Sequence, residues 1–200
     1  MDVSMRVMQN INGAIPARIA ALALLVALAN CTSTSVSTGY YEVSGSTGKA
    51  LDRSIALNGP MSGDAFAATQ LTIVPVSVIP VETEKGCKVQ SAKFKLNAKI
   101  TMPRWTNRKG ASADLQNGFD MFADYARLHE DIHVQIGEAA VQEMEAAVLA
   151  LPPQKNCDVL QAKVTSVLAR VQARHHKAQL AFDAAEDKRI NALLKSAARK

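Results

Sequence analysis

The chain has 200 residues, of which 48% are hydrophobic and 20% are charged, and its formal net charge is +5 at pH 7. This length and composition are sufficient for one hydrophobic core, so we expect a single mature domain. The basic residues are scattered apart from a cluster near the C-terminus, and the chain has one Trp and no nucleic-acid-binding motif. The sequence therefore gives no support to nucleic-acid binding.

The first thirty residues have the features of a signal peptide. Arg6 and Arg18 precede an uninterrupted apolar run over residues 19–29. That run has the length of a signal-peptide core and is too short to span a bilayer comfortably. We therefore expect residues 1–30 to direct export, and the mature protein to reside in the periplasm or cell envelope.

Two cleavage positions are open. One follows the small-residue pattern that ends at Ala29. The other precedes Cys31, because Leu28-Ala29-Asn30-Cys31 resembles a bacterial lipobox, although Asn is an unusual residue before that cysteine. In the second case Cys31 would carry a lipid anchor, which is the only membrane attachment that we expect. Residues 31–39 are rich in Thr and Ser and are predicted to tether a single domain over residues 40–200.

The first elements of the predicted domain are short. Tyr40–Val43 is predicted to form a strand, and a helix with a Ser or Thr cap at residues 46–47 should end at Asn58-Gly59-Pro60. Residues 71–78 are rich in β-branched side chains, which favour a strand. Pro75 has no backbone N–H to donate, so this strand should lie at a sheet edge or contain a bulge.

The clearest strand covers Val89–Met102. Apolar and polar residues alternate through this segment, with Phe94, Leu96 and Ile100 on the apolar side. Alternation over that length predicts one buried face and one solvent-exposed face. Trp105 follows the strand and is predicted to pack between the sheet and the helices rather than to bind a ligand.

The C-terminal half of the chain has a helical period. From about Ser112 to Leu149 apolar residues recur at steps of three and four, and Pro152-Pro153 ends this helix. A second helix is capped by Asn156 or Asp158 and continues towards the C-terminus. We therefore predict an α+β fold in which a small antiparallel sheet packs against a long antiparallel helix pair.

An H-E-x-x-H motif lies inside the first of these helices, with the sequence His129-Glu130-Asp131-Ile132-His133. Histidines four residues apart project from one face of a helix and can hold one Zn²⁺, as on a zincin-like metal helix. Neutral imidazoles leave the charge of the ion uncompensated, so the ion lowers the pKa of a bound water towards ~7, and Glu130 can remove the proton. Tyr125, one turn earlier, could stabilise an oxyanion, although a helix-packing role is the more common one.

A catalytic zinc usually needs three protein ligands and one open position, so the motif alone is incomplete. If the two long helices run antiparallel about a turn near Gln154, equal rise per residue places position 175 opposite His133 and position 179 opposite His129. The pair His175-His176 falls in this layer. All four histidines of the chain would then gather at one level of the helix pair.

The third ligand has several candidates. His176 is the first choice, because it shares a helical face with Asp183, whereas His175 points about 100° away from that face. Asp183 is the second choice. Glu186 remains open, and Glu138 is less suitable because a residue five positions after His133 points away from the metal face.

Two cysteines remain if Cys31 is lipidated. Cys87 and Cys157 form an even pair in an oxidising compartment and lack the spacing of a metal or redox motif. We therefore predict a structural disulfide between the sheet region and the helix pair.

The chain resembles a bacterial family of predicted secreted zinc-dependent proteases that is catalogued as a domain of unknown function. The resembling segments cover most of the predicted domain and are Tyr40–Gly45, Asn58-Gly59-Pro60, Gly86–Val89, Leu96–Trp105, His129–His133 and Ala181-Phe182-Asp183. The resemblance implies export, zinc and hydrolysis, carried by His129, Glu130 and His133. Some members continue after the Phe-Asp pair to Thr-x-His-Gly, whereas this chain has Glu186-Asp187-Lys188-Arg189. A histidine ligand from that stretch is therefore ruled out.

These features together predict an exported zinc metallopeptidase with peptide or protein substrates in the cell envelope. His129, His133 and His176 would bind zinc, and Glu130 would act as general base and later as proton donor. Two alternatives remain open. One is a zinc-dependent cell-wall amidase that uses the same activated water, and the other is a non-catalytic envelope lipoprotein whose histidines bind metal structurally or not at all.

Overall fold

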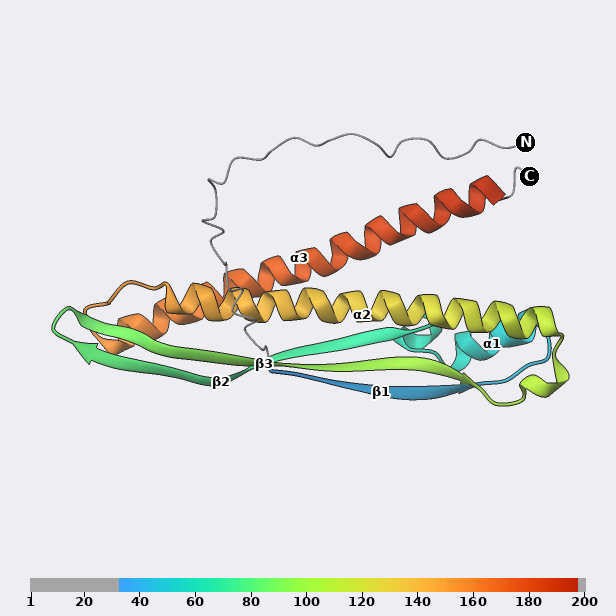
Figure 1. Ribbon diagram of the computed structural model, residues 1–200, viewed down its shortest axis with the longest axis horizontal. Helices are drawn as coiled ribbons and strands as arrows, with labels where there is room; N and C mark the ends of the chain where they lie inside the picture. Colours follow the sequence, from blue (N-terminus) through green and yellow to red (C-terminus); the bar gives the residue numbers. More distant parts are fainter. Residues whose placement is uncertain (1–32, 198–200) are drawn as a thin grey trace, which may run out of the picture.

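The computed structural model describes residues 33–197, with side chains through Ala192. Within these residues the fold is α+β and consists of a three-stranded sheet and three α-helices (Figure 1). The predicted signal peptide and Cys31 lie outside the described residues.

The sheet is built around its longest strand, β3 (Gly86–Trp105), which lies between β1 (Ser33–Val43) and β2 (Ala68–Thr83). The predicted alternation is present in β3, where every second side chain is buried through most of its length and Leu96 and Ile100 are fully buried. β2 runs antiparallel to β3 and β1 runs parallel to it. The buried face of β3 thus forms the centre of the core.

The prediction of an antiparallel sheet is therefore only partly correct. β1 and β2 run in opposite directions, but β3 inserts between them and so pairs in parallel with β1, from Ser33 opposite Lys95 to Val43 opposite Trp105. β1 also begins seven residues before the predicted strand. Residues 33–39 belong to the sheet and not to a tether, because their Ser, Thr and Val side chains suit an extended strand that pairs along β3.

Pro75 has the position that the sequence predicts. β2 is an edge strand, and its pairing with β3 shifts register between Pro75 and Ser77 and again between Ile79 and Pro80. A residue without an N–H is tolerated at such a bulge on an edge strand. On the opposite edge of β3, the described pairing with β1 begins at Lys95, and the backbone N–H of the preceding Phe94 donates to Glu145 Oε1 at 3.0 Å.

The three α-helices start at the predicted caps. Thr47 caps α1 (Gly48–Asn58) and Ser112 caps α2 (Ala113–Leu149), each by accepting a hydrogen bond from a first-turn N–H. Asn156 Oδ1 accepts from the N–H of Val159 at 2.9 Å at the start of α3 (Cys157–Ala197). Two short 3-10 turns, η1 (Met61–Gly63) and η2 (Arg108–Gly110), complete the connections. In this part of the chain, none of the helices has a stretch apolar and long enough to span a bilayer.

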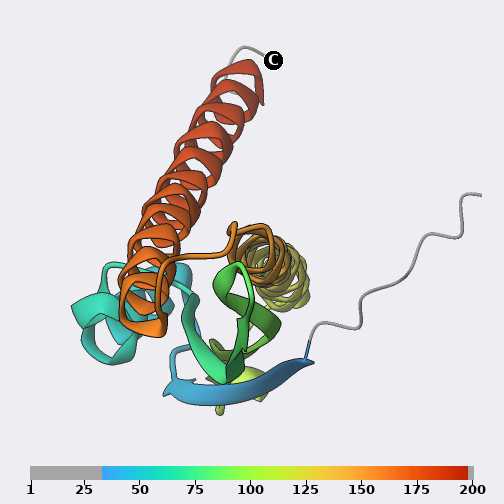
Figure 2. The ribbon, with the colours of Figure 1, turned by 90° about the vertical axis from the view of Figure 1, so that its left-hand side faces the viewer.

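α2 lies along the length of the sheet, whereas α3 crosses it near the β2–β3 hairpin and then rises away from the sheet (Figures 1 and 2). The core between these layers combines β3 with Val141, Met144 and Val148 of α2 and with a buried stripe of α3. Trp105 packs with Leu51 of α1 and Phe119 of α2 in a second cluster at the other end. Its predicted role as a packing residue is confirmed.

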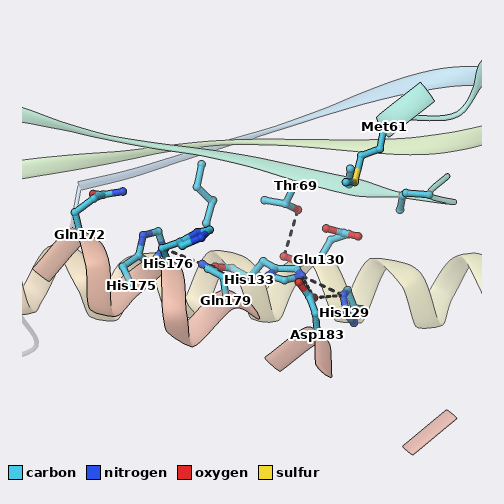
Figure 3. Close-up of a pocket in the computed structure, with 14 residues that line it drawn as sticks. Met61, Thr69, His129, Glu130, His133, Gln172, His175, His176, Gln179 and Asp183 are labelled. Carbon is cyan, nitrogen blue, oxygen red and sulfur yellow. Dashed lines mark hydrogen bonds and ion pairs between the residues drawn. The ribbon is translucent and has the colours of Figure 1, made fainter. Parts of the chain in front are cut away.

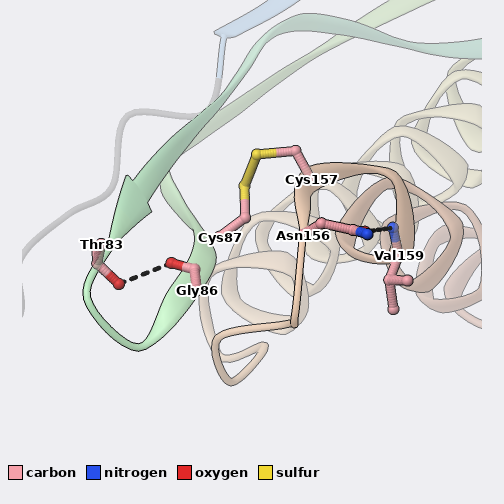
Figure 4. The surroundings of a disulfide bond; sticks show 6 residues. All are labelled: Thr83, Gly86, Cys87, Asn156, Cys157 and Val159. Atoms are coloured by element: carbon pink, nitrogen blue, oxygen red, sulfur yellow. Dashed lines mark hydrogen bonds between the residues drawn. A yellow bond between two sulfur atoms is a disulfide. The ribbon is translucent and has the colours of Figure 1, made fainter.

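The turn between α2 and α3 is attached to the end of the β2–β3 hairpin (Figure 4). Cys87 and Cys157 form the predicted disulfide. Cys87 and Gln154 also exchange two backbone hydrogen bonds, both of 2.8 Å, so the turn adds a bridge to the sheet before α3 begins. These links fix where the first residue of α3 lies relative to the sheet.

Gly137 allows α2 to approach the sheet closely, one turn after His133. A Cβ atom added at Gly137 would lie 3.0 Å from Leu96 Cδ2 and 3.3 Å from Leu71 Cδ1. Both contacts are tighter than ordinary van der Waals separation, so the Leu96 and Leu71 side chains or the helix would have to shift by a few tenths of an ångström. The position of the H-E-x-x-H motif over the sheet therefore depends on a residue without a side chain.

We predict that Gly137→Leu lowers the free energy of unfolding by about 1–3 kcal/mol, because the added side chain overpacks the helix–sheet contact. Gly118 lies on the same helix, is exposed, and has no atom within 4 Å of a built Cβ. Gly118→Leu should therefore leave stability unchanged or raise it by roughly 0.5 kcal/mol through helix propensity. Urea denaturation of both variants measures the difference, and equal stabilities would contradict this account.

Candidate metal centre

Three potential ligand atoms converge where α2 faces α3 (Figure 3). His129 Nε2 and His133 Nε2 lie 3.0 Å apart. Asp183 Oδ1 lies 3.0 Å from His133 Nε2 and 3.3 Å from His129 Nε2. Two imidazoles of one helix and one carboxylate of the next thus surround a single point.

The two helices position these groups in different ways. His129 and His133 are four residues apart on α2 and therefore share one face. Phe182 of α3 packs against both rings, with centroid distances of 4.7 Å and 5.1 Å. The aromatic contact limits the rotation of the rings, while the next residue along α3 supplies the carboxylate.

The separations fit a tetrahedral metal ion. Zinc binds nitrogen and carboxylate oxygen at about 2.0–2.2 Å, which places neighbouring tetrahedral ligands roughly 3.3 Å apart. The three observed separations, from 3.0 to 3.3 Å, are close to that value. Two histidines and one carboxylate also form a ligand set found at catalytic zinc, which keeps a fourth position for water or substrate. His129, His133 and Asp183 could therefore hold zinc.

Glu130 lies beside this cluster and is only 5% exposed. In Figure 3 its carboxylate is on the side of α2 that faces the strands, and the Thr69 hydroxyl donates to its backbone carbonyl at 3.5 Å. Both residues line a cavity of about 480 Å³ between α2, α3 and the start of β2, together with His129, His133 and Asp183. A carboxylate next to candidate metal ligands and open to a cavity can accept a proton from a bound water.

The structure brings Asp183, and not His176, next to the two motif histidines. His176 lines the cavity but is exposed and does not belong to the converging group, whereas Asp183, the second choice from the sequence, does. The sequence predicted that His175 points away from the site. In the structure His175, and not His176, is buried. Glu186 and Glu138 also lie outside the group.

The sequence placed the wrong α3 residues opposite the motif because the register of α3 against α2 differs from the one assumed. Gln179 contacts His133 and Asp183 contacts His129, so each partner lies four residues later in α3 than equal rise about Gln154 predicts. The turn pairs with β3 through Gln154 before α3 starts at Cys157, which shifts α3 along α2. A shift of four residues is about one helical turn.

Gln179 and His175 were not predicted to take part in the site. Gln179 contacts His133 Nδ1 at 2.6 Å through Oε1, and its Nε2 lies 3.1 Å from the His133 carbonyl oxygen and 2.8 Å from His175 Nε2. Burial lowers the pKa of His175, and the neighbouring charge of His176 lowers it further. One signal could have found both residues, because the apolar stripe through Val164, Val167 and Val171 continues at helical spacing to His175 and Gln179.

Tyr125 belongs to a separate hydrogen-bonded group next to the cluster. Its hydroxyl donates to Glu186 and accepts from Arg189. The Arg189 guanidinium also donates directly to the Glu186 carboxylate, and this contact, followed by the hydrogen bond from Tyr125, lowers the pKa of Glu186 to about 2. Burial raises the pKa of Tyr125, and the Glu186 carboxylate raises it further. With its hydroxyl engaged by two α3 side chains, Tyr125 links the helices and is less suited to stabilise an oxyanion.

We predict that Asp183→Ala weakens zinc binding more than roughly 100-fold, because loss of a group that only orients a ligand already costs about 10- to 100-fold. His176→Ala removes a cavity residue that lies outside the converging group, so its zinc affinity should stay within a few-fold of the wild type. Competition with a chromogenic chelator measures both affinities. A larger loss in His176→Ala than in Asp183→Ala would reverse the ligand assignment.

Comparison with known proteins gives one match. No curated protein and no solved structure matches the chain. A family model matches residues 38–189, which include all three strands except the first residues of β1, and also the H-E-x-x-H motif and Asp183. The chain therefore belongs to the family described as "Bacterial protein of unknown function (DUF922)".

Proposed function

We propose that the protein is an exported zinc-dependent metallopeptidase. The observation that carries the proposal is the convergence of His129, His133 and Asp183 within 3.0–3.3 Å of one another, beside a cavity that Glu130 lines. Two imidazole nitrogens and a carboxylate oxygen at these separations can direct three lone pairs at one cation. The combination with a buried carboxylate on the same helix supports hydrolysis rather than a purely structural metal.

The residues take distinct roles in this proposal. His129, His133 and Asp183 would hold the ion, which when bound supplies a water of lowered pKa and polarises a substrate carbonyl. Glu130 would accept a proton from the attacking water and return it to the leaving amine. The low exposure of Glu130 restricts its access to bulk water, so the proton stays near the reacting atoms.

The cavity walls favour an extended peptide as substrate. Residues 67–69 and Leu71 form one wall, and within the described residues β2 is an edge strand of the sheet. Such an edge can pair with an extended peptide through main-chain hydrogen bonds. Ala65, Ala67 and Ala68 have small side chains, which leave room along this wall for the side chains of a substrate. A cell-wall amide could also reach the site, but it has no extended row of backbone groups that could pair with the edge of β2.

Location in the cell envelope is part of the same proposal. The disulfide between Cys87 and Cys157 suits an oxidising compartment and only weakly supports export by itself. The signal-peptide features of residues 1–30 supply the main argument.

We predict that Glu130→Gln keeps zinc and loses activity by about 10²- to 10⁴-fold, because the amide cannot accept the proton of the attacking water. The assay is release of peptides from unfolded β-casein by the zinc-loaded protein, with zinc content measured by elemental analysis. Glu138→Gln on the same helix is the matched control and should retain activity, since Glu138 lies outside the cluster. Wild-type turnover in Glu130→Gln would contradict the proposed mechanism, and release from peptidoglycan but not from casein would indicate an amidase.

A further inference from the structure

We propose that Gln179 is a positioning residue that fixes the tautomer of His133, so that the lone pair of its Nε2 faces His129 and Asp183. The functional role of this arrangement depends on the proposed metal site. Its structural content concerns only the hydrogen bonds of Gln179, which can be tested without a metal.

The orientation of the Gln179 amide follows from one backbone contact. The His133 carbonyl oxygen can only accept, and a side-chain atom of Gln179 lies 3.1 Å from it. That atom must therefore be the donor, Nε2, because the flipped amide would place two oxygens at this distance without a hydrogen between them. Oε1 is then the atom 2.6 Å from His133 Nδ1.

The position of Oε1 determines which ring nitrogen of His133 carries the proton. An amide oxygen accepts only, so His133 Nδ1 must donate. In the neutral ring the other nitrogen, Nε2, then has a free lone pair. This lone pair is directed at the point where His129 Nε2 and Asp183 Oδ1 lie, each 3.0 Å away.

His175 holds the amide in this orientation from the other side. Gln179 Nε2 lies 2.8 Å from His175 Nε2, so its two hydrogens have two acceptors, the His133 carbonyl and the His175 ring. His175 is 9% exposed and lines the same cavity. Every polar atom of the Gln179 amide is therefore hydrogen-bonded, and rotation of the amide would break three contacts at once.

The function follows from the chemistry of metal ligands. A histidine binds zinc through a deprotonated nitrogen, and a hydrogen bond to its other nitrogen fixes the ring and raises its basicity. Loss of such a partner typically costs 10- to 100-fold in metal affinity. Gln179 thus fixes the ring and the tautomer of His133 in the form that binds a cation, even when no cation is bound.

The test is long-range ¹H–¹⁵N NMR of the metal-free protein, purified from an oxidising host, because this spectrum distinguishes the two tautomers of each histidine. We expect the Nδ1–H form for His133 in the wild type and loss of that form in Gln179→Met. Gln179→Glu loses the donor to the His133 carbonyl but keeps an oxygen acceptor for Nδ1–H, so it should keep the tautomer. An Nε2–H signal for His133 in the wild type would overturn the inference without the need for any variant.

Zinc affinity provides the second readout. We expect Gln179→Met to bind zinc about 10- to 100-fold more weakly than the wild type, and Gln179→Glu to recover at least part of this loss. Gln172→Met, which changes a residue lining the same cavity two turns earlier in α3, is the control and should bind zinc normally. Unchanged affinity in Gln179→Met would overturn the positioning role. The Nδ1–H tautomer in a wild type that binds no zinc would support the hydrogen-bond assignment and contradict the proposed function.

Discussion

The candidate site depends on the register between α2 and α3. His129 and His133 belong to one helix and Asp183 to the other, so a shift of α3 by a single turn would remove the carboxylate from the cluster. The register is set about twenty-six residues away along α3, where the turn pairs with β3 through Gln154 and the disulfide joins Cys157 to Cys87. Buried contacts of Leu160, Val164, Val167 and Val171 carry that register along the helix up to the histidines.

The sheet contributes the other half of the site. β3 supplies the buried face against which α2 lies, and Gly137 lets the helix approach it closely just after the motif. Glu130 faces the strands, and the cavity has strand residues on one side and metal-ligand candidates on the other (Figure 3). α3 then rises away from the sheet (Figure 2), which leaves the site at the point where the three layers separate. A cavity at such a junction of layers can admit a substrate, while the candidate metal-coordinating side chains stay on rigid helices.

The sequence was sufficient to predict the features that depend on neighbouring residues in the chain. The period-two pattern identified β3, the helical period and caps identified α2 and α3, and the H-E-x-x-H spacing brought His129 and His133 together. It was insufficient where the answer depends on tertiary contacts. Nothing local in β1 indicates that β3 would insert beside it in parallel, and the position of Asp183 depends on how the turn attaches to the sheet. The buried side of α3 could have been taken from its apolar stripe, which leads to His175 and Gln179 rather than to His176.

The proposed function depends on His129, His133 and Asp183 holding one zinc ion. The most direct test is a crystal structure of the zinc-loaded protein with data collected on both sides of the zinc absorption edge, because the anomalous difference map locates the ion without reference to any assumed ligand. We expect one peak in contact with the two Nε2 atoms and the Asp183 carboxylate, close to Glu130. A peak at His175 and His176, or a protein that takes up no zinc while correctly folded, would contradict it.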